Sequence, residues 1–144
     1  MLDAIAAESH RLSTWFMVGV IWFVQLVHYP LMEHTAGTQA TSYAREHQRR
    51  TGFVVILPML LELLTGVWLT LGLWQQSGVA WLNLGLLAVV WASTVFFQVP
   101  AHRQLAESFD ARVHARLVRS NWLRTVAWTA RGFLLWGLSS GASG

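Results

Sequence analysis

The stretch from Thr51 to Leu73 reads TGFVVILPMLLELLTGVWLTLGL, an apolar segment long enough to cross a membrane that nevertheless carries one carboxylate, Glu62. With Thr51 near the membrane surface, a helical rise of about 1.5 Å per residue puts Glu62 about 16 Å deep, near the middle of the hydrocarbon layer. An ionisable side chain at that depth is costly and usually faces a bundle interior, where it pairs with another polar group. We therefore expect a helical bundle that holds a partner for Glu62.

The composition is typical of a small membrane protein with a single domain, residues 1–144. Of these residues 54% are hydrophobic, and nine are Trp. The chain has no Cys, which excludes disulfides, thiolate metal ligands and cysteine nucleophiles. The net charge of +3 comes from Arg, since there is no Lys, and the arginines cluster beside the apolar segments. That pattern indicates contact with a lipid bilayer and gives no reason to expect a nucleic-acid partner.

Four apolar segments predict four membrane-spanning helices, at residues 12–31, 52–73, 79–99 and 121–138. Short connections between them favour an all-α, up-down-up-down bundle, with an amphipathic helix in the Arg-rich segment after the third span. The second helix is expected to begin near Ser42, before its apolar part. Pro30 is expected to stop or kink the first helix, and Asn121 to cap the start of the last one.

The orientation follows from the arginines in the short connections. The first and third connections carry Arg45, Arg49, Arg50, Arg103, Arg112, Arg116 and Arg119, whereas the second connection and the C-terminal tail carry none. The positive-inside rule then places the first and third connections in the cytoplasm and both termini outside. We expect a multi-pass protein of a bacterial-type inner (cell) membrane.

Arg131 is the predicted partner of Glu62. It lies ten residues beyond Asn121, hence roughly 15 Å into the fourth span, which matches the depth of Glu62. The second and fourth helices lie diagonally in such a bundle and address the same core. We predict that the two side chains are coupled, directly or through one water or ligand, as catalytic groups. The alternative is a buried ion pair that only fixes helix register.

The histidines supply a second set of candidates at the cytoplasmic end. His28, His47 and His102, together with Glu62, have the ligand chemistry of a transition-metal site for Fe, Zn, Mn or Cu, although their spacing matches no metal motif. A haem held by His28 and His102 is a second cofactor hypothesis. The third interpretation is that these histidines are interfacial or only hydrogen-bonded. The remaining histidines, which are expected to be solvated, are His10, His34 and His114.

Polar residues near these histidines and on the last helix are candidate substrate contacts. Asn121 and Arg124 are placed to orient an anionic or carbonyl oxygen, and they share a helix face with Trp128 and Arg131. Gln98 shares a face with His102. We therefore expect Gln98, Asn121, Arg124 and Trp128 to contact a bound molecule.

Two stretches of the second half, VPAHRQLAESF at 99–109 and RLVRSNWLRTVAWTARG at 116–132, carry a family resemblance. They resemble the signature of the anthrone-oxygenase-like group of small four-helix integral membrane proteins, and Asn121-x-x-Arg124-Thr125 is the most specific piece. His102 stands where that group is expected to carry Asn. The resemblance implies a four-helix fold and oxidation of an aromatic or lipophilic substrate.

Three classes of function follow from these observations. The first is an oxidoreductase or oxygenase with its polar site in the cytoplasmic half of the bundle. The second is a non-catalytic accessory subunit of a larger membrane complex, in which the polar core is structural. The third is a proton or small-solute pathway that uses Glu62, for which a chain this small would have to form a homo-oligomer.

Overall fold

Four long helical rods make up the residues that the computed structural model describes, 1–35 and 38–140. The first rod joins α1 (Leu2–Phe23), the π-helical turn η1 (Val24–His28) and α2 (Tyr29–Met32). The second is α3 (Thr38–Leu71). The third joins α4 (Gly78–Ser93), the π-helical turn η2 (Thr94–Gln98) and α5 (Val99–Glu107), and the fourth is α6 (Ala111–Ser140). The all-helical class predicted from the sequence is therefore confirmed.

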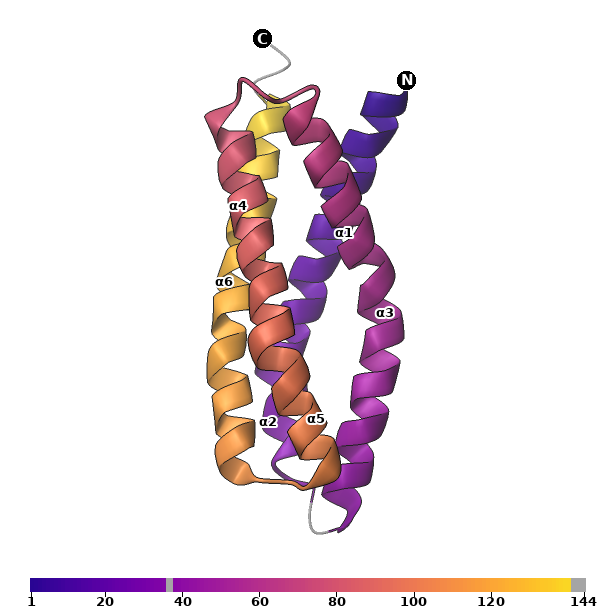
Figure 1. Cartoon of the computed structure of the whole chain (residues 1–144), viewed down its shortest axis with the longest axis vertical. Helices are drawn as coiled ribbons and strands as arrows, with labels where there is room; N and C mark the ends of the chain where they lie inside the picture. The colour runs from indigo at the N-terminus through magenta and orange to yellow at the C-terminus, as the bar shows by residue number, and fades with distance from the viewer. Residues whose placement is uncertain (36–37, 141–144) are drawn as a thin grey trace.

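The rods run alternately up and down, so both termini lie at the same end of the bundle as the α3–α4 connection (Figure 1). The α2–α3 and α5–α6 connections lie at the opposite end. α1 packs beside α3 and α6, and α4 also packs beside these two helices. α3 and α6 consequently face each other across a diagonal, as the sequence predicted for the helices that carry Glu62 and Arg131.

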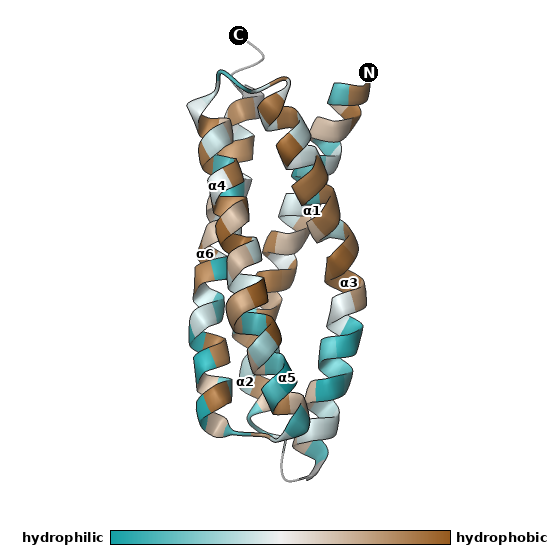
Figure 2. Cartoon of the chain, viewed as in Figure 1, coloured by the Kyte–Doolittle hydropathy of each residue, from teal (hydrophilic) through white to brown (hydrophobic). Residues whose placement is uncertain are grey.

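Three of the rods are long and apolar enough to cross a membrane: Leu2–Met32, Gln39–Leu71 and Gly78–Glu107. Among the described residues, α6 does not reach the mean hydropathy of the other three rods, because its arginines lower the average. Hydrophobic residues cover most of the bundle, whereas hydrophilic residues gather on α3, α5 and α6 at the end away from the termini (Figure 2). The bundle therefore has one distinctly polar end.

Two helix starts differ from the sequence predictions. The first helix begins at Leu2, well before residue 12, and buries Ala7 against the bundle. Asn121 does not cap a helix, because α6 already begins at Ala111. The Asp110 carboxylate supplies the cap instead, accepting hydrogen bonds from the backbone N–H groups of Arg112, at 2.7 Å, and Val113, at 3.4 Å.

The two π-helical turns each end two residues before a proline, Pro30 or Pro100. In a regular α-helix a proline ring clashes with the carbonyl four residues earlier. The wider turn absorbs that clash, so Pro30 does not stop its helix, which continues to Met32. The same two turns end on His28 and Gln98, two residues of the candidate site.

Glycine allows close packing of α3 against α1 at Gly66. A Cβ atom there would lie 2.9 Å from His10 Cε1 and 3.3 Å from Leu87 Cδ2. His10 is 1% exposed, and its Nδ1 lies 2.9 Å from the Thr65 hydroxyl. The predicted solvation of His10 is therefore wrong, because α1 begins early enough to carry this residue into the bundle.

We predict that Gly66→Ala destabilises the bundle by about 1–3 kcal/mol, because the added methyl group overpacks the contact with His10. Thermal unfolding in detergent, followed by circular dichroism, measures the change. Gly85→Ala is the matched control, because a Cβ added at Gly85 would have no neighbouring atom within 4 Å. Equal melting temperatures for the two variants would contradict the close packing.

Candidate functional site

A fully enclosed ion pair links α3 and α6 across the bundle diagonal. Arg131 Nη1 donates to Glu62 Oε1 at 2.5 Å, and both side chains are 0% exposed. The Trp128 indole N–H donates to Glu62 Oε2 at 3.0 Å, so both carboxylate oxygens have a donor. The coupling of Glu62 with Arg131 predicted from their depths is confirmed, and the contact is direct.

Asn83 on α4 completes this network. Arg131 Nε donates to Asn83 Oδ1 at 3.3 Å, while Asn83 Nδ2 donates to the backbone carbonyl of Arg131 at 3.2 Å. These polar contacts tie three helices together, and they are shielded from water, since Glu62, Trp128 and Arg131 are 0% exposed and Asn83 is 4% exposed. These contacts define a structural clamp, and a catalytic role for Glu62 and Arg131 stays a prediction.

The histidine cluster lies nearer the polar end of the bundle. The rings of His28 from η1 and His47 from α3 stack with their centroids 3.8 Å apart, and the His102 ring from α5 lies 5.4 Å from that of His47. The Tyr29 hydroxyl reaches both His102 Nε2, at 3.1 Å, and Gln98 Oε1, at 3.3 Å. The structure therefore brings together the three histidines that the sequence placed at one depth.

The predicted four-ligand metal set is not assembled. Glu62 lies about 22 Å along α3 from His47, at 1.5 Å per residue, so it cannot share an ion with the histidines. Within the described residues, no three His, Asp or Glu side chains are grouped to hold a metal ion. His28 and His47 stack face to face, which keeps their nitrogen lone pairs from converging on one ion.

The haem hypothesis also meets a steric obstacle. The His47 ring contacts the rings of both candidate axial ligands, His28 and His102. A macrocycle held between those two ligands would need the space that His47 occupies. The donor set and its packing thus fit neither of the two cofactors considered from the sequence.

A chain of polar contacts along α6 joins Gln25 on η1 to the clamp. Asn121 Nδ2 donates to Gln25 Oε1 at 2.8 Å, and Arg124 Nη1 donates to Asn121 Oδ1 at 3.1 Å. The Arg124 guanidinium lies over the Trp128 ring, 5.0 Å from its centroid, a cation–π contact. Trp128 therefore contacts Arg124 with its face and Glu62 with its N–H group.

A chamber of about 140 Å³ lies among these polar groups. Its lining includes Tyr29, His47, Gln98, His102 and Arg124. Of the predicted substrate contacts, Gln98 and Arg124 line the chamber. Asn121 does not line it but accepts a hydrogen bond from Arg124 and so orients that side chain. The chamber thus brings His47, Gln98, His102 and Arg124 of the predicted site residues around one space.

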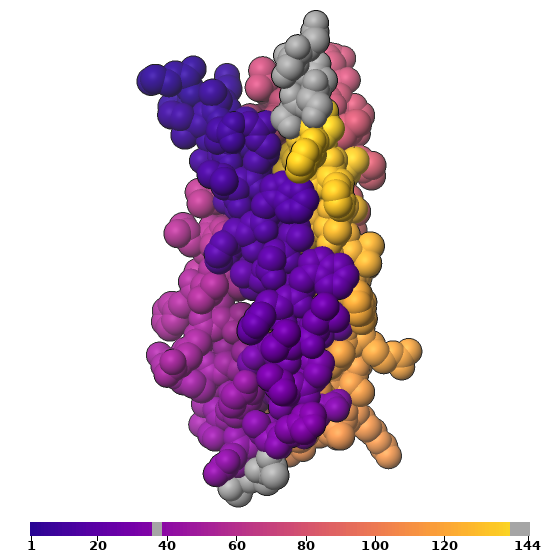
Figure 3. Space-filling model, turned by 180° about the vertical axis from the view of Figure 1, so that it is seen from behind, coloured from indigo at the N-terminus to yellow at the C-terminus, as the bar shows by residue number. Residues whose placement is uncertain are grey.

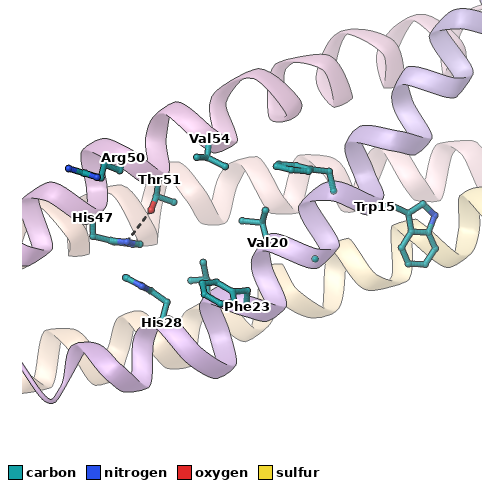
Figure 4. A pocket seen from close by; sticks show the side chains of 11 residues that line it. Trp15, Val20, Phe23, His28, His47, Arg50, Thr51 and Val54 are labelled. Carbon is teal, nitrogen blue, oxygen red and sulfur yellow. Dashed lines mark hydrogen bonds between the residues drawn. The ribbon is translucent and has the colours of Figure 1, made fainter.

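A wider groove of about 570 Å³ runs between α1 and α3. Its apolar wall is formed by Trp15, Phe16, Gly19, Val20, Phe23, Val24 and Val54, and its polar end by His28, His47, Arg50 and Thr51. Figure 3 shows the face of the molecule on which α1 lies between α3 and α6. In Figure 4, His28 and His47 point toward each other at one end of the groove, and His47 contacts Thr51.

The groove and the chamber share a wall, because Val20, Val24, His47 and Thr51 line both. An apolar groove at the surface of the bundle is therefore adjacent to an inner chamber that has polar groups among its mostly apolar lining. Neither Glu62 nor Arg131 lines either space. The site consequently divides into a closed clamp and an accessible chamber.

Sequence reasoning missed Tyr29 and misassigned His114. Tyr29 is 1% exposed and places its hydroxyl between Gln98 and His102. His114, predicted to be solvated, is 1% exposed, and its Nε2 lies 3.1 Å from the Tyr29 backbone carbonyl. The signal available in the sequence was the His28-Tyr29-Pro30 run itself, which places an aromatic hydroxyl next to a candidate histidine. His34 is exposed, as predicted.

Comparisons with protein-family models, curated proteins and solved structures find no match for this chain.

We predict that Glu62→Gln lowers the free energy of unfolding by about 3–5 kcal/mol, because it leaves Arg131 buried without its counter-ion. Denaturant unfolding in mixed micelles measures the loss. The matched control is Glu46→Gln on the same helix, which removes a solvent-exposed pairing with Arg49 and Arg50 and should change stability by less than about 1 kcal/mol. A Glu62→Gln variant as stable as this control would show that the clamp does not hold the bundle together.

Proposed function

We propose that this chain is a membrane protein that binds a lipophilic, oxygen-bearing small molecule and exchanges a proton with it. The observation that carries the proposal is the wall shared by the apolar groove and the polar chamber. Binding sites for small molecules are mostly apolar, with a few polar groups that fix orientation. A molecule arriving from the bilayer would pass between α1 and α3 and present its oxygen to His47, His102 and Tyr29.

The proposal includes α6 as a fourth membrane span. Its two deeper arginines are turned inward, Arg124 at 8% and Arg131 at 0% exposure, so neither charge faces lipid. The outward side of the same helix presents exposed apolar side chains, which include Leu123, Val126, Phe133 and Trp136. Charged residues that face a bundle interior are compatible with a spanning helix.

The orientation is part of the same proposal. The arginine-rich connections lie together at the polar end of the bundle, and the termini lie at the other end. By the positive-inside rule the polar end is cytoplasmic and both termini are outside, in a bacterial-type inner membrane. The chamber then lies in the cytoplasmic half of the bilayer.

The chemistry available in the chamber is acid–base chemistry. A neutral imidazole can accept a proton from a bound molecule. The Tyr29 hydroxyl contacts His102 Nε2, so a proton can pass between the hydroxyl and the imidazole. Gln98 and Arg124 offer further polar contacts to a bound oxygen. The resemblance to the anthrone-oxygenase-like group favours an oxidoreductase. A hydroquinone-type substrate would release two protons, the first of them to this cluster, and pass two electrons to molecular oxygen, giving the quinone and hydrogen peroxide.

The proposal predicts that filling the groove blocks binding. Gly19 lines the groove, and a Cβ added there would have no neighbouring atom within 4 Å. The leucine side chain of Gly19→Leu therefore occupies the groove without disturbing the helices. We expect it to weaken binding of decylhydroquinone at least tenfold, measured by Trp fluorescence quenching in nanodiscs. Gly85→Leu, a change of the same size at an open position of α4, should bind as the wild type does. Unchanged binding by Gly19→Leu would overturn the site.

The acid–base step is tested separately with His47→Gln. We expect this variant to bind decylhydroquinone or an anthrone within a few-fold of the wild type while its oxidation, followed by oxygen uptake, slows by about 100-fold. His34→Gln, at an exposed position, is the control. Wild-type turnover in His47→Gln would remove His47 from the reaction, and oxygen uptake equal to that of empty nanodiscs in the wild type would remove the oxidase class.

A further inference from the structure

Arg124 is a buried cation without a counter-ion. It is 8% exposed, and within the described residues no Asp or Glu carboxylate lies at ion-pair distance from it. Its Nη1 is satisfied by Asn121, but its buried Nε has no hydrogen-bond partner. A buried charge is costly unless it is paired, so this guanidinium is poised for an anion.

The residue that carries this unpaired donor is one of those that line the chamber. Arg124 lines that space together with His102, whose Nδ1 is also buried without a partner. The Tyr29 hydroxyl donates to Gln98 Oε1, so it accepts from His102 Nε2, and His102 Nδ1 is then an acceptor. The unused N–H group is therefore that of Arg124, and a guanidinium N–H makes charge-assisted hydrogen bonds to oxyanions.

The contrast with Arg131 strengthens this interpretation. Both arginines belong to α6 and both are buried, yet Arg131 has Glu62 at 2.5 Å while Arg124 has only an amide and an aromatic face. The chain therefore compensates one charge internally and leaves the other to be compensated. Arg124 lines the chamber, which shares a wall with the groove, whereas Arg131 lines neither space.

The groove determines what the anion is attached to. A second apolar space, also about 570 Å³, continues the groove along α1 and α3, and the two share Phe16 and Val54. Together they follow α1 from Leu12 to His28, about 24 Å at 1.5 Å per residue. That elongated apolar path suits one long alkyl chain, and the chamber of about 140 Å³ suits a compact head group.

We infer that the ligand is a long-chain carboxylate, whose ionised head group pairs with Arg124 in the chamber and whose single alkyl chain lies in the groove between α1 and α3. A carboxyl group is ionised at neutral pH, whereas a simple phenol is not. A permanently charged guanidinium therefore selects the carboxylate. This inference rests on the proposed function for the entry route and adds the charge and chain type of the molecule bound.

The test compares two amphiphiles of equal length, hexadecanoate and hexadecanol, on the full chain in nanodiscs, with empty nanodiscs subtracted. Binding of tritium-labelled ligand is measured by scintillation proximity at neutral pH. We expect hexadecanoate to bind at least tenfold more tightly than hexadecanol. Arg124→Gln should weaken hexadecanoate binding by about 10- to 100-fold and leave hexadecanol within about twofold, because only the charge-assisted contact is lost.

Two further variants keep the result interpretable. Arg124→Lys, which retains the charge and loses the fork of donors, should restore part of the hexadecanoate binding. Arg119→Gln removes an exposed charge from the same helix and should bind as the wild type does. Gly19→Leu should weaken both amphiphiles.

Equal binding of hexadecanoate and hexadecanol by the wild type would overturn the inference, as would an Arg124→Gln variant that retains full hexadecanoate binding. In both cases the proposed function stands if Gly19→Leu still weakens decylhydroquinone. Loss of both amphiphiles together in Arg124→Gln, with Arg124→Lys equally inactive, would mean that Arg124 only supports the fold. The proposed function itself fails only when decylhydroquinone binding is absent or insensitive to Gly19→Leu.

Discussion

The Glu62–Arg131 ion pair constrains the whole bundle, because neither charge has any access to water. Each partner comes from one of the two helices on a diagonal, so the contact crosses the centre of the fold instead of an edge. Sliding α3 or α6 by one turn would move a carboxylate or a guanidinium by about 5 Å and leave both charges unpaired. Asn83 and Trp128 hold the same groups from the sides, which fixes their rotamers as well as their depth.

Once that register is set, the positions of the chamber groups follow from it. Trp128 donates its N–H to Glu62, which turns the face of its ring toward Arg124 one turn away on α6. Arg124 is then held by a ring face and by Asn121, its Nε has no hydrogen-bond partner, and the residue lines the chamber. The clamp thus acts as a positioning element for the accessible site, even though Glu62 and Arg131 do not line that site.

Depth and helix geometry explain why part of this arrangement could be predicted from the sequence. Glu62 and Arg131 lie at matching distances along apolar segments, and a charge in such a segment needs a partner. The three histidines were placed at one depth by the same reasoning. This reasoning does not give the direction in which each side chain leaves its helix or the hydrogen bonds that it makes. Glu62 was therefore grouped with His47, although about four helical turns separate them. Depth counted from one end of each segment cannot tell two layers of the same bundle apart.

The predicted start of the last helix and the predicted solvation of His114 were wrong for a different reason. Asn121 resembles an N-cap in isolation, but its side chain is used by Gln25 and Arg124, and Asp110, eleven residues earlier, caps the helix. His114 was expected to be solvated, yet its side chain is buried and contacts the Tyr29 backbone carbonyl on α2. Tertiary contacts that involve residues far apart in the chain decide both cases, and no local pattern encodes them.

The groove depends on where the chain puts small residues. On the side of α1 that faces α6, Trp15 fills the space over Gly132, with its ring 3.2 Å from where a Cβ would be. On the side that faces α3, a Cβ at Gly19 or Gly52 would meet nothing within 4 Å. The same helix therefore closes against one neighbour and leaves a channel beside the other. Because the open side lies against the chamber that Arg124 lines, the proposed site combines the space left by these glycines with the charge left unpaired on α6.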